Sequence, residues 1–248
     1  MNYYSMTDIG KKRSNNEDSY FSKIKEINGL EVGLFVIADG MGGYEHGEYA
    51  SQKTVEVIKD TMKKEFYKLG ESEPSNDTII GYIRNSVQAA NKDVLEESMK
   101  RGLLMGSTVA IAVIFGNKLV VANVGDSRTY MLSDGNFVQI SKDNSYVQEL
   151  LESGAINSDE ARTHSERNKI TRAVGVEPEI QVDFYERELQ KDDKLLICSD
   201  GLNTMLNDEE IKRILYKDET AKNIVEQLLD LVNEKGAYDN TTVTCVLI

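Results

Sequence analysis

The chain has 248 residues, enough for one domain or two small ones around a large buried core. Its 42 acidic residues outnumber 29 Lys and Arg, so the formal net charge is −13, and no basic cluster stands apart from acidic neighbours. This balance argues against nucleic acid as a partner, because a phosphate backbone is bound by concentrated positive charge. A hydrophobic fraction of 40% and evenly spread charges favour a folded globular protein.

Three features predict a cytoplasmic protein that does not bind membranes. The N-terminal residues show no basic stretch followed by an apolar one, as a secretory signal would. The longest apolar run, residues 109–115, is far shorter than the roughly 20 residues that span a membrane. Cys198 and Cys245 each lie in an apolar run, which is typical of buried free thiols in a reducing compartment.

In chain order, the first half predicts a strand over 33–38, two helices, and strands over 108–115, 118–124 and 128–132. The two-residue connection Gly116-Asn117 and the turn Asp134-Gly135 predict antiparallel hairpins. The predicted apolar helix faces are Thr54, Ile58, Met62 and Leu69 in the first helix, and Ile83, Val87, Ala90 and Val94 in the second.

The second half predicts strands over 194–198 and 242–248, with helices between them. Asn207 and Glu210 have the spacing of a capping box, and the apolar stripe over 224–232 stops at Gly236. Regular alternation of strand and helix is missing, which disfavours a doubly wound parallel sheet. We therefore expect one α+β domain over residues 1–248, with antiparallel sheets covered by helix pairs.

Carboxylates stand at the margins of these strands. Asp and Gly are common in turns, so a turn alone explains any single one of them. As a set they would repel one another if the strand ends converge, unless cations lie among them. Such oxygen ligands suit Mg²⁺ or Mn²⁺, whereas zinc is disfavoured because His46 and His164 are the only histidines. The acids are Glu17, Asp18, Asp39, Asp126, Asp200 and Asp239.

Other catalytic classes lack the residues that they need. No histidine follows His164 to act as the base of a serine hydrolase. A cysteine phosphatase needs an arginine shortly after its cysteine, but Thr204 stands six residues after Cys198. There is no P-loop and no kinase signature. Arg13, four residues before Glu17, would bind phosphate oxygens near a cation site, although alone it would be taken for a surface arginine.

The chain resembles the metal-dependent Ser/Thr phosphatases of the protein phosphatase 2C family, in their compact bacterial form. Seven segments match in order over almost the whole length: RSNNED (13–18), ADGMGG (38–43) with GEYAS (47–51), GST (106–108), NVGDSR (123–128), LLESG (150–154) with TRAVG (171–175), CSDGL (198–202) and DNTT (239–242). The resemblance implies a four-layer α/β/β/α sandwich of two antiparallel sheets flanked by helix pairs, with metals in a cleft at one end.

The resemblance also implies a ligand set for two Mn²⁺ or Mg²⁺ ions and a third, weaker one. Asp39 would bridge two metals, and Gly40 would lend its carbonyl oxygen. Glu17 would complete the shell of one metal. Asp200 and Asp239 would complete that of the other, and the third metal would use Asp126 with Asp200.

Further residues have implied supporting roles. Asp18 and Asn240 would orient ligands and waters, and Arg13 would bind the phosphate. Residues from about 145 to 170 would form a mobile flap that contributes to substrate choice. The implied reaction is hydrolysis of phosphoserine and phosphothreonine in proteins by a water that two metals bridge and activate, without a phosphoenzyme.

The implied partners are phosphorylated proteins, the substrates of a bacterial Ser/Thr kinase, and the simplest assembly is a monomer. Two alternatives stay open: a pseudophosphatase that binds phosphoproteins without hydrolysis, and a hydrolase of small phosphomonoesters. Tyr44 and Asn144 replace histidines that many bacterial members have, which leaves the acid that protonates the leaving alkoxide open. We favour a metal-bound water over His46, because a lone histidine near a helix start is more often a surface residue.

Overall fold

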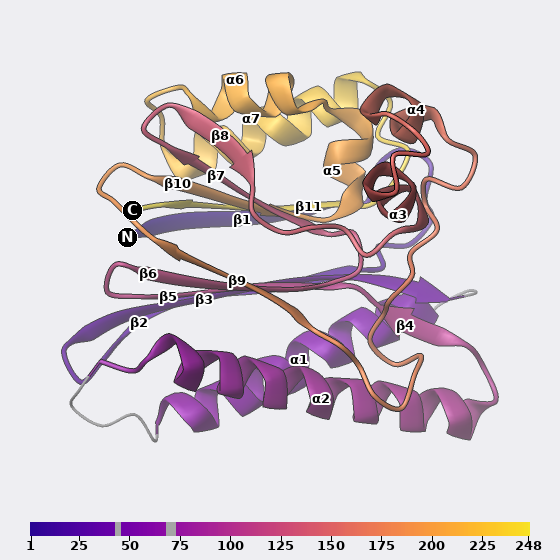
Figure 1. The fold of residues 1–248 in the computed structure, drawn as a ribbon, viewed down its shortest axis with the longest axis horizontal. Coiled ribbons are helices and arrows are strands. Elements are labelled where there is room, and N and C mark those ends of the chain that lie inside the picture. Colours follow the sequence, from indigo (N-terminus) through magenta and orange to yellow (C-terminus); the bar gives the residue numbers. More distant parts are fainter. Residues whose placement is uncertain (43–45, 68–72) are drawn as a thin grey trace.

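The computed structural model describes residues 1–42, 46–67 and 73–248. Two antiparallel sheets pack face to face, and helices cover the outer face of each sheet (Figure 1). The predicted four-layer α+β sandwich is therefore confirmed. The side chains between the sheets are apolar, as Phe35, Ile37 and Ile197 illustrate, and all three are fully buried.

The first sheet has the strand order β1-β11-β10-β7-β8. Helices α5, α6 and α7 cover its outer face, and the predicted apolar stripe of α7 is buried against it. The predicted capping box is present, since the Asn207 side chain accepts from the Glu210 N–H and the Glu210 side chain accepts from the Asn207 N–H. The bounds are β1 (Asn2–Asp8), β11 (Thr241–Leu247), β10 (Lys194–Cys198), β7 (Arg128–Ser133), β8 (Asn136–Gln139), α5 (Asp200–Met205), α6 (Asp208–Leu215) and α7 (Ala221–Glu234).

The second sheet has the order β2-β3-β5-β6-β9, and the short strand β4 pairs with the far end of β3. Helices α1 and α2 cover it and bury the predicted faces of both helices, apart from Leu69, which lies outside the described residues. Both predicted hairpins are present. The bounds are β2 (Asp18–Ile27), β3 (Leu30–Gly42), β5 (Val109–Phe115), β6 (Lys118–Val124), β9 (Asp183–Glu188), β4 (Met105–Ser107), α1 (His46–Phe66) and α2 (Asn76–Arg101).

One strand boundary corrects the sequence prediction at an important residue. We expected a strand to end at Ala38, with Asp39 just beyond it. Instead β3 continues to Gly42, because β4 pairs with this extension and places Gly40 opposite Ser107. Asp39 therefore stands inside a paired strand.

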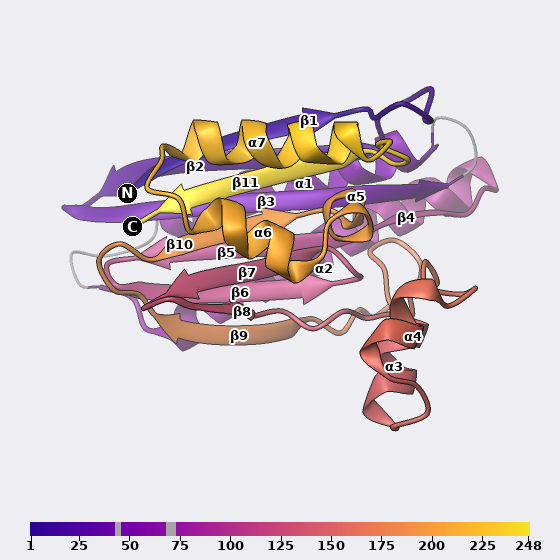
Figure 2. The same ribbon diagram turned by 90° about the horizontal axis from the view of Figure 1, so that it is seen from above.

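The segment between Ser145 and Ile170 leaves the sandwich at one end, where Figure 2 shows its two helices beside the sheets. These are α3 (Tyr146–Glu152) and α4 (Ser158–Thr163). An antiparallel bridge between Ser145 and Ile170 closes the base of the segment. Both cysteines are buried and free. In the part of the chain that the structure describes, no helix combines the length and the apolar character that crossing a bilayer requires.

Candidate metal centre

The predicted acids come from different strands but meet at one end of the sandwich, on the right in Figure 1. Asp18 begins β2 and stands directly opposite Asp39 of β3 in the antiparallel register. Asp126 follows β6, Asp200 begins α5 directly after the turn that ends β10, and Asp239 precedes β11. Residues separated by up to about 220 positions are thus gathered into one cluster by strand pairing.

Burial and mutual repulsion dominate the electrostatics of this cluster. The pKa of Asp39 lies well above its ordinary value, first because the carboxyl is buried and then because Asp18, Asp200, Asp126 and Asp239 are close. Burial and the charge of Asp239 raise the pKa of Asp200 to about 6, although a hydrogen bond with Asp39 lowers it in part. The cluster holds more negative charge than its surroundings stabilise, so a cation placed among these acids would be favourable.

Asp126 belongs to the same electrostatic system. Its side chain is buried, and its pKa is raised well above the ordinary value by burial and then by the charges of Asp200 and Asp143. A cavity of about 250 Å³ joins Asp126 and Asp200 to the 145–170 segment, from which Arg162 and Arg167 line it. The cavity connects the acids with cationic side chains of that segment.

Asp18 has one satisfied oxygen and one that lacks a partner. Its Oδ2 accepts hydrogen bonds from Ser199 Oγ and Thr242 Oγ1, each at 2.7 Å. Its Oδ1 is buried and has no hydrogen-bond partner among the described residues. Burial raises the pKa of Asp18 to about 7, against the two hydrogen bonds that lower it. A buried carboxylate oxygen without a donor is costly, and a water held by a cation would supply that donor.

Glu17 and Gly40 lie together at the start of α1. The Gly40 N–H donates to the Glu17 carbonyl at 3.0 Å. A Cβ on Gly40 would lie 1.9 Å from the Gly47 carbonyl oxygen, and one on Gly47 would lie 2.6 Å from Glu17 Oε1 and 2.8 Å from the Gly40 carbonyl oxygen. Burial raises the pKa of Glu17, while Arg13 and a backbone hydrogen bond with Gly47 lower it. Glycine at positions 40 and 47 therefore allows the Glu17 carboxylate and the Gly40 carbonyl oxygen to lie this close to the start of α1, because any side chain there would collide with them.

Asn240 holds the N-terminal loop that carries Glu17 and Arg13. Its Oδ1 accepts from the Glu17 N–H at 2.9 Å, and its Nδ2 donates to the carbonyls of Ile9 and Asn15, both at 2.9 Å. All of its polar side-chain atoms are thus used by the backbone of this loop. Asn240 therefore holds the backbone of this loop in place at Glu17.

Arg13 forms an ion pair with Asp239, with Nη2 2.7 Å from Oδ2. The hydrogen bond that Arg13 donates to Asp239 is the main reason why the pKa of Arg13 is raised, against a smaller opposing effect of burial. Its side chain is 49% exposed, so the guanidinium stands at the mouth of the acid cluster. An arginine fixed in this way can bind oxygens of an anion that approaches the acids.

A buried ion pair that the sequence did not predict lies behind Asp126. Arg128 Nε and Nη2 donate to both oxygens of Asp143 at 2.7–3.0 Å, and Nη1 donates to Tyr130 Oη at 3.0 Å. The charge of Arg128 also lowers the pKa of Asp126 in part. Arg128 ends the segment NVGDSR (123–128), but nothing in the sequence indicates that Asp143 is its partner.

Tyr44 and Asn144 stand where many family members have histidines, and His46 lies two residues after Tyr44. Asn144 is buried, its Oδ1 accepts from the Gly125 N–H at 3.0 Å, and its Nδ2 donates to Asp183 at 2.8 Å. It therefore fixes the loop before Asp126. His46 is the first residue of α1, and Tyr44 lies outside the described residues.

The donor set fits a hard divalent cation. Its side chains are carboxylates, with a backbone carbonyl at Gly40, and Asp18 Oδ1 lacks a donor. Among the described residues, no three His, Cys, Asp or Glu side chains close a metal shell by themselves. Mg²⁺ and Mn²⁺ accept this arrangement, because Mg²⁺ commonly keeps several waters and takes only one or two carboxylates.

Comparisons with known proteins agree with this picture. A family model described as "Protein phosphatase 2C" matches residues 10–246. The chain is 35% identical over 242 residues to a serine/threonine phosphatase stp of Listeria monocytogenes, covering 97% of this chain and 93% of that protein.

Solved structures give the same result. A serine/threonine phosphatase of S. agalactiae superimposes with a TM-score of 0.88 at 30% identity, covering 99% of this chain and 98% of that chain. The catalytic domain of the phosphatase PstP in complex with two manganese ions superimposes with a TM-score of 0.82 at 33% identity, covering 98% and 96% of the two chains. This chain therefore belongs to the protein phosphatase 2C family.

Proposed function

We propose that this protein hydrolyses phosphoserine and phosphothreonine in proteins, using Mn²⁺ or Mg²⁺ held by its acid cluster. The observation that carries the proposal is the partly buried acid cluster around Asp39, where desolvation and four other carboxylates raise the pKa of Asp39. Relatives named as serine/threonine phosphatases support the substrate class. The manganese complex of PstP supports the metal.

The proposed holders of the metals follow from the positions described above. Asp39 would serve two ions, with the Gly40 carbonyl and Glu17 on one side and Asp200 and Asp239 on the other. Asp126 with Asp200 would hold a third, weaker ion. When bound, the cations would activate a water and stabilise charge on the phosphoryl group, so that no phosphoenzyme is needed.

The remaining residues would position the substrate and the ligands. Arg13 would bind phosphate oxygens while its pair with Asp239 keeps the guanidinium beside the cluster. Asp18 would orient a ligand through its unpartnered Oδ1, and Asn240 would hold the loop of Glu17. Most of the rate acceleration would be electrostatic, since these groups are fixed before the substrate binds.

We further propose that the substrates are proteins phosphorylated by a bacterial Ser/Thr kinase, and that the enzyme acts as a cytoplasmic monomer built from one catalytic domain. Residues 145–170 would act as the flap that contributes to substrate choice. Support comes from the cavity that they share with Asp126 and Asp200, which Arg162 and Arg167 line. These two arginines would favour substrates with acidic or phosphorylated residues near the scissile group.

The decisive experiment measures phosphate release from a phosphothreonine peptide with and without Mn²⁺. We expect release that depends on Mn²⁺, that collapses in Asp39→Asn, and that is unchanged in the control Asp93→Asn on the exposed surface of α2. No release from wild type, with Mn²⁺ binding retained in calorimetry, would favour the pseudophosphatase. Hydrolysis of small phosphomonoesters but of no phosphopeptide or phosphoprotein would favour the small-molecule hydrolase.

A further inference from the structure

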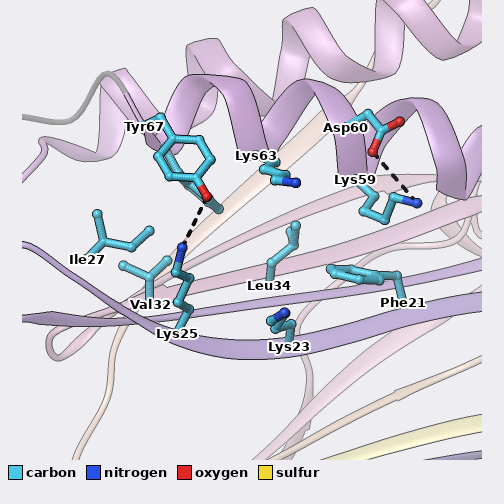
Figure 3. A pocket seen from close by; sticks show the side chains of 11 residues that line it. Phe21, Lys23, Lys25, Ile27, Val32, Leu34, Lys59, Asp60, Lys63 and Tyr67 are labelled. Atoms are coloured by element: carbon cyan, nitrogen blue, oxygen red, sulfur yellow. Dashed lines mark hydrogen bonds and ion pairs between the residues drawn. The ribbon is translucent and has the colours of Figure 1, made fainter.

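A second cavity, remote from the acid cluster, lies between the sheet and α1. It has a volume of about 390 Å³, within the roughly 300–1,000 Å³ range of small-molecule sites. Figure 3 shows it between the face of β2 and β3 and the C-terminal half of α1. We call it the lysine pocket. Its floor is apolar and consists of Phe21, Ile27, Val32, Leu34 and Phe66.

The sheet register explains which side chains line the pocket. Alternate residues of β2 point to one face, so Phe21, Lys23, Lys25 and Ile27 line the pocket together. Lys23 lies opposite Leu34 of β3. β2 is the edge strand of its sheet, and α1 covers the neighbouring β3 more fully than it covers β2. Val32 and Leu34 of β3 are almost fully buried, so the accessible apolar surface of the pocket comes mainly from the partly buried Phe21 and Ile27, beside the exposed lysines of β2.

The rim of the pocket is positively charged in a chain of net charge −13. Lys23 and Lys25 of β2 face Lys59 and Lys63 of α1 across the cavity (Figure 3). Like charges gathered in this way repel one another unless an anion lies among them. Asp60 is the one acid that lines the pocket among the described residues, and it pairs with Lys59 at 3.7 Å.

Tyr67, which also lines the pocket, is affected by the charges of these lysines. Lys25 Nζ donates to Tyr67 Oη at 3.3 Å and lies 4.8 Å from the ring centroid. The hydrogen bond from Lys25, and then the charges of Lys25 and Lys63, lower the pKa of Tyr67. In the part of the chain that the structure describes, Lys23 and Lys63 form no ion pair. Their charges are therefore available to a ligand.

We propose that the lysine pocket binds a small amphipathic anion, with an aromatic or aliphatic body on the apolar floor and a carboxylate, sulfonate or phosphate head among the lysines. A free small molecule fits better than a membrane or an acidic protein surface. The net charge of −13 repels any extended anionic surface, whereas a small ion responds mainly to charges within a Debye length, about 8–10 Å.

The test is calorimetric titration of the Mn²⁺-loaded protein with 1-naphthalenesulfonate at an ionic strength of about 0.1 M, where the Debye length is about 10 Å. We expect binding that weakens about tenfold in Lys23→Gln/Lys63→Gln and persists in Lys92→Gln/Lys222→Gln, which removes the same charge from the exposed surfaces of α2 and α7. Equal affinity in the two double variants would overturn the proposal.

Two further titrations locate the site. Neutral 1-naphthol should bind about tenfold more weakly than the sulfonate, because it lacks the anionic head. Arg13→Ala should bind the sulfonate as wild type does. A loss of affinity in Arg13→Ala would place the probe at the acid cluster and overturn the proposal, as would equal affinity for the sulfonate and the naphthol.

Discussion

The guanidinium of Arg13 lies 2.7 Å from Oδ2 of Asp239, although 226 positions separate the two residues in the sequence. This contact places a half-exposed arginine at the mouth of a partly buried acid cluster. The two side chains have opposite charges, so they would attract different partners of the proposed reaction. Arg13 would attract the phosphate, and Asp239 would attract the metal.

Arg13→Ala should therefore separate substrate binding from metal binding. We expect kcat/KM for a phosphothreonine peptide to fall about 100-fold, since the loss of a charge-assisted pair to phosphate costs roughly 3 kcal/mol. Mn²⁺ affinity in calorimetry should stay equal or increase, because a positive charge is removed. Arg13→Lys should recover only part of the activity, as lysine lacks the planar fork. A large loss of Mn²⁺ affinity would show that Arg13 instead supports the metal site.

The stability of the metal-free protein should fall as pH rises from about 4 to about 7. Folding raises the pKa of Asp18 to about 7 and that of Asp200 to about 6, so the folded state binds more protons than the unfolded chain in this range. The stabilisation is complete below the unfolded pKa near 4 and is lost as the pH passes through the folded values. Thermal melts in EDTA at pH 4 to 8 measure this dependence.

Asp39→Asn provides the internal control for the pH effect. It removes one buried charge, so it should raise the melting temperature of the metal-free protein at pH 8 and change it little at pH 4. Saturating Mn²⁺ should remove most of the pH dependence of wild type by compensating the acids. A metal-free melting temperature that increases between pH 5 and 7 would contradict the buried-acid interpretation.

Gly40→Ala should disable the metal centre. Its Cβ would lie 1.9 Å from the Gly47 carbonyl oxygen and 2.9 Å from that of Glu17, so the start of α1 would have to move away from the acid cluster. We expect a loss of stability of at least about 2 kcal/mol and weakened Mn²⁺ binding. The matched control is Gly81→Ala inside α2, where the new methyl meets nothing within 4 Å. It should stabilise by about 0.5–1 kcal/mol.

Asp143→Asn should destabilise the protein through the Arg128 that it leaves behind. Arg128 has a side chain only 22% exposed and donates to both Asp143 oxygens. Removing one partner of such a buried pair costs about 3–5 kcal/mol. The double variant Arg128→Met/Asp143→Leu should regain much of that stability in chemical unfolding. If the single variant unfolds like wild type, the pair contributes little.

His46→Gln should leave turnover on a phosphopeptide nearly unchanged. His46 begins α1 and is only partly buried, which suits a helix-terminal residue better than a general acid. Steady-state kinetics over pH 6 to 9 measure the effect. A decrease on the order of 100-fold, the low end for removing a general acid, would instead identify His46 as the group that protonates the leaving alkoxide.

The sequence predicted best the strands that are buried on both faces. β5, β6 and β10 are continuous apolar runs because one face meets the opposite sheet and the other meets helices. The edge strands β1 and β9 were not predicted, since polar side chains occupy much of both. Their pairing is determined by partners distant in the sequence, which local pattern does not contain.

The same limit applies to the candidate metal centre. The residue types of the acids, and the glycines beside them, are visible in the motifs. The contacts around those acids are not visible there. Ser199 and Thr242 reach Asp18, and Asp143 reaches Arg128, only through strand register and loop packing. The prediction that β3 ends before Asp39 failed for a similar reason, since its continuation depends on pairing with β4.

The position of β11 has a consequence for how the protein is made. This strand lies between β1 and β10, and Asn240 beside it holds the loop that carries Glu17. Asp39 and Asp126 leave the ribosome long before Asp239 and Asn240, so a nascent chain has only part of the proposed metal centre. Until β11 is made, the first sheet also lacks the strand that joins β1 to β10, and the unpaired edges of those two strands can pair with other chains.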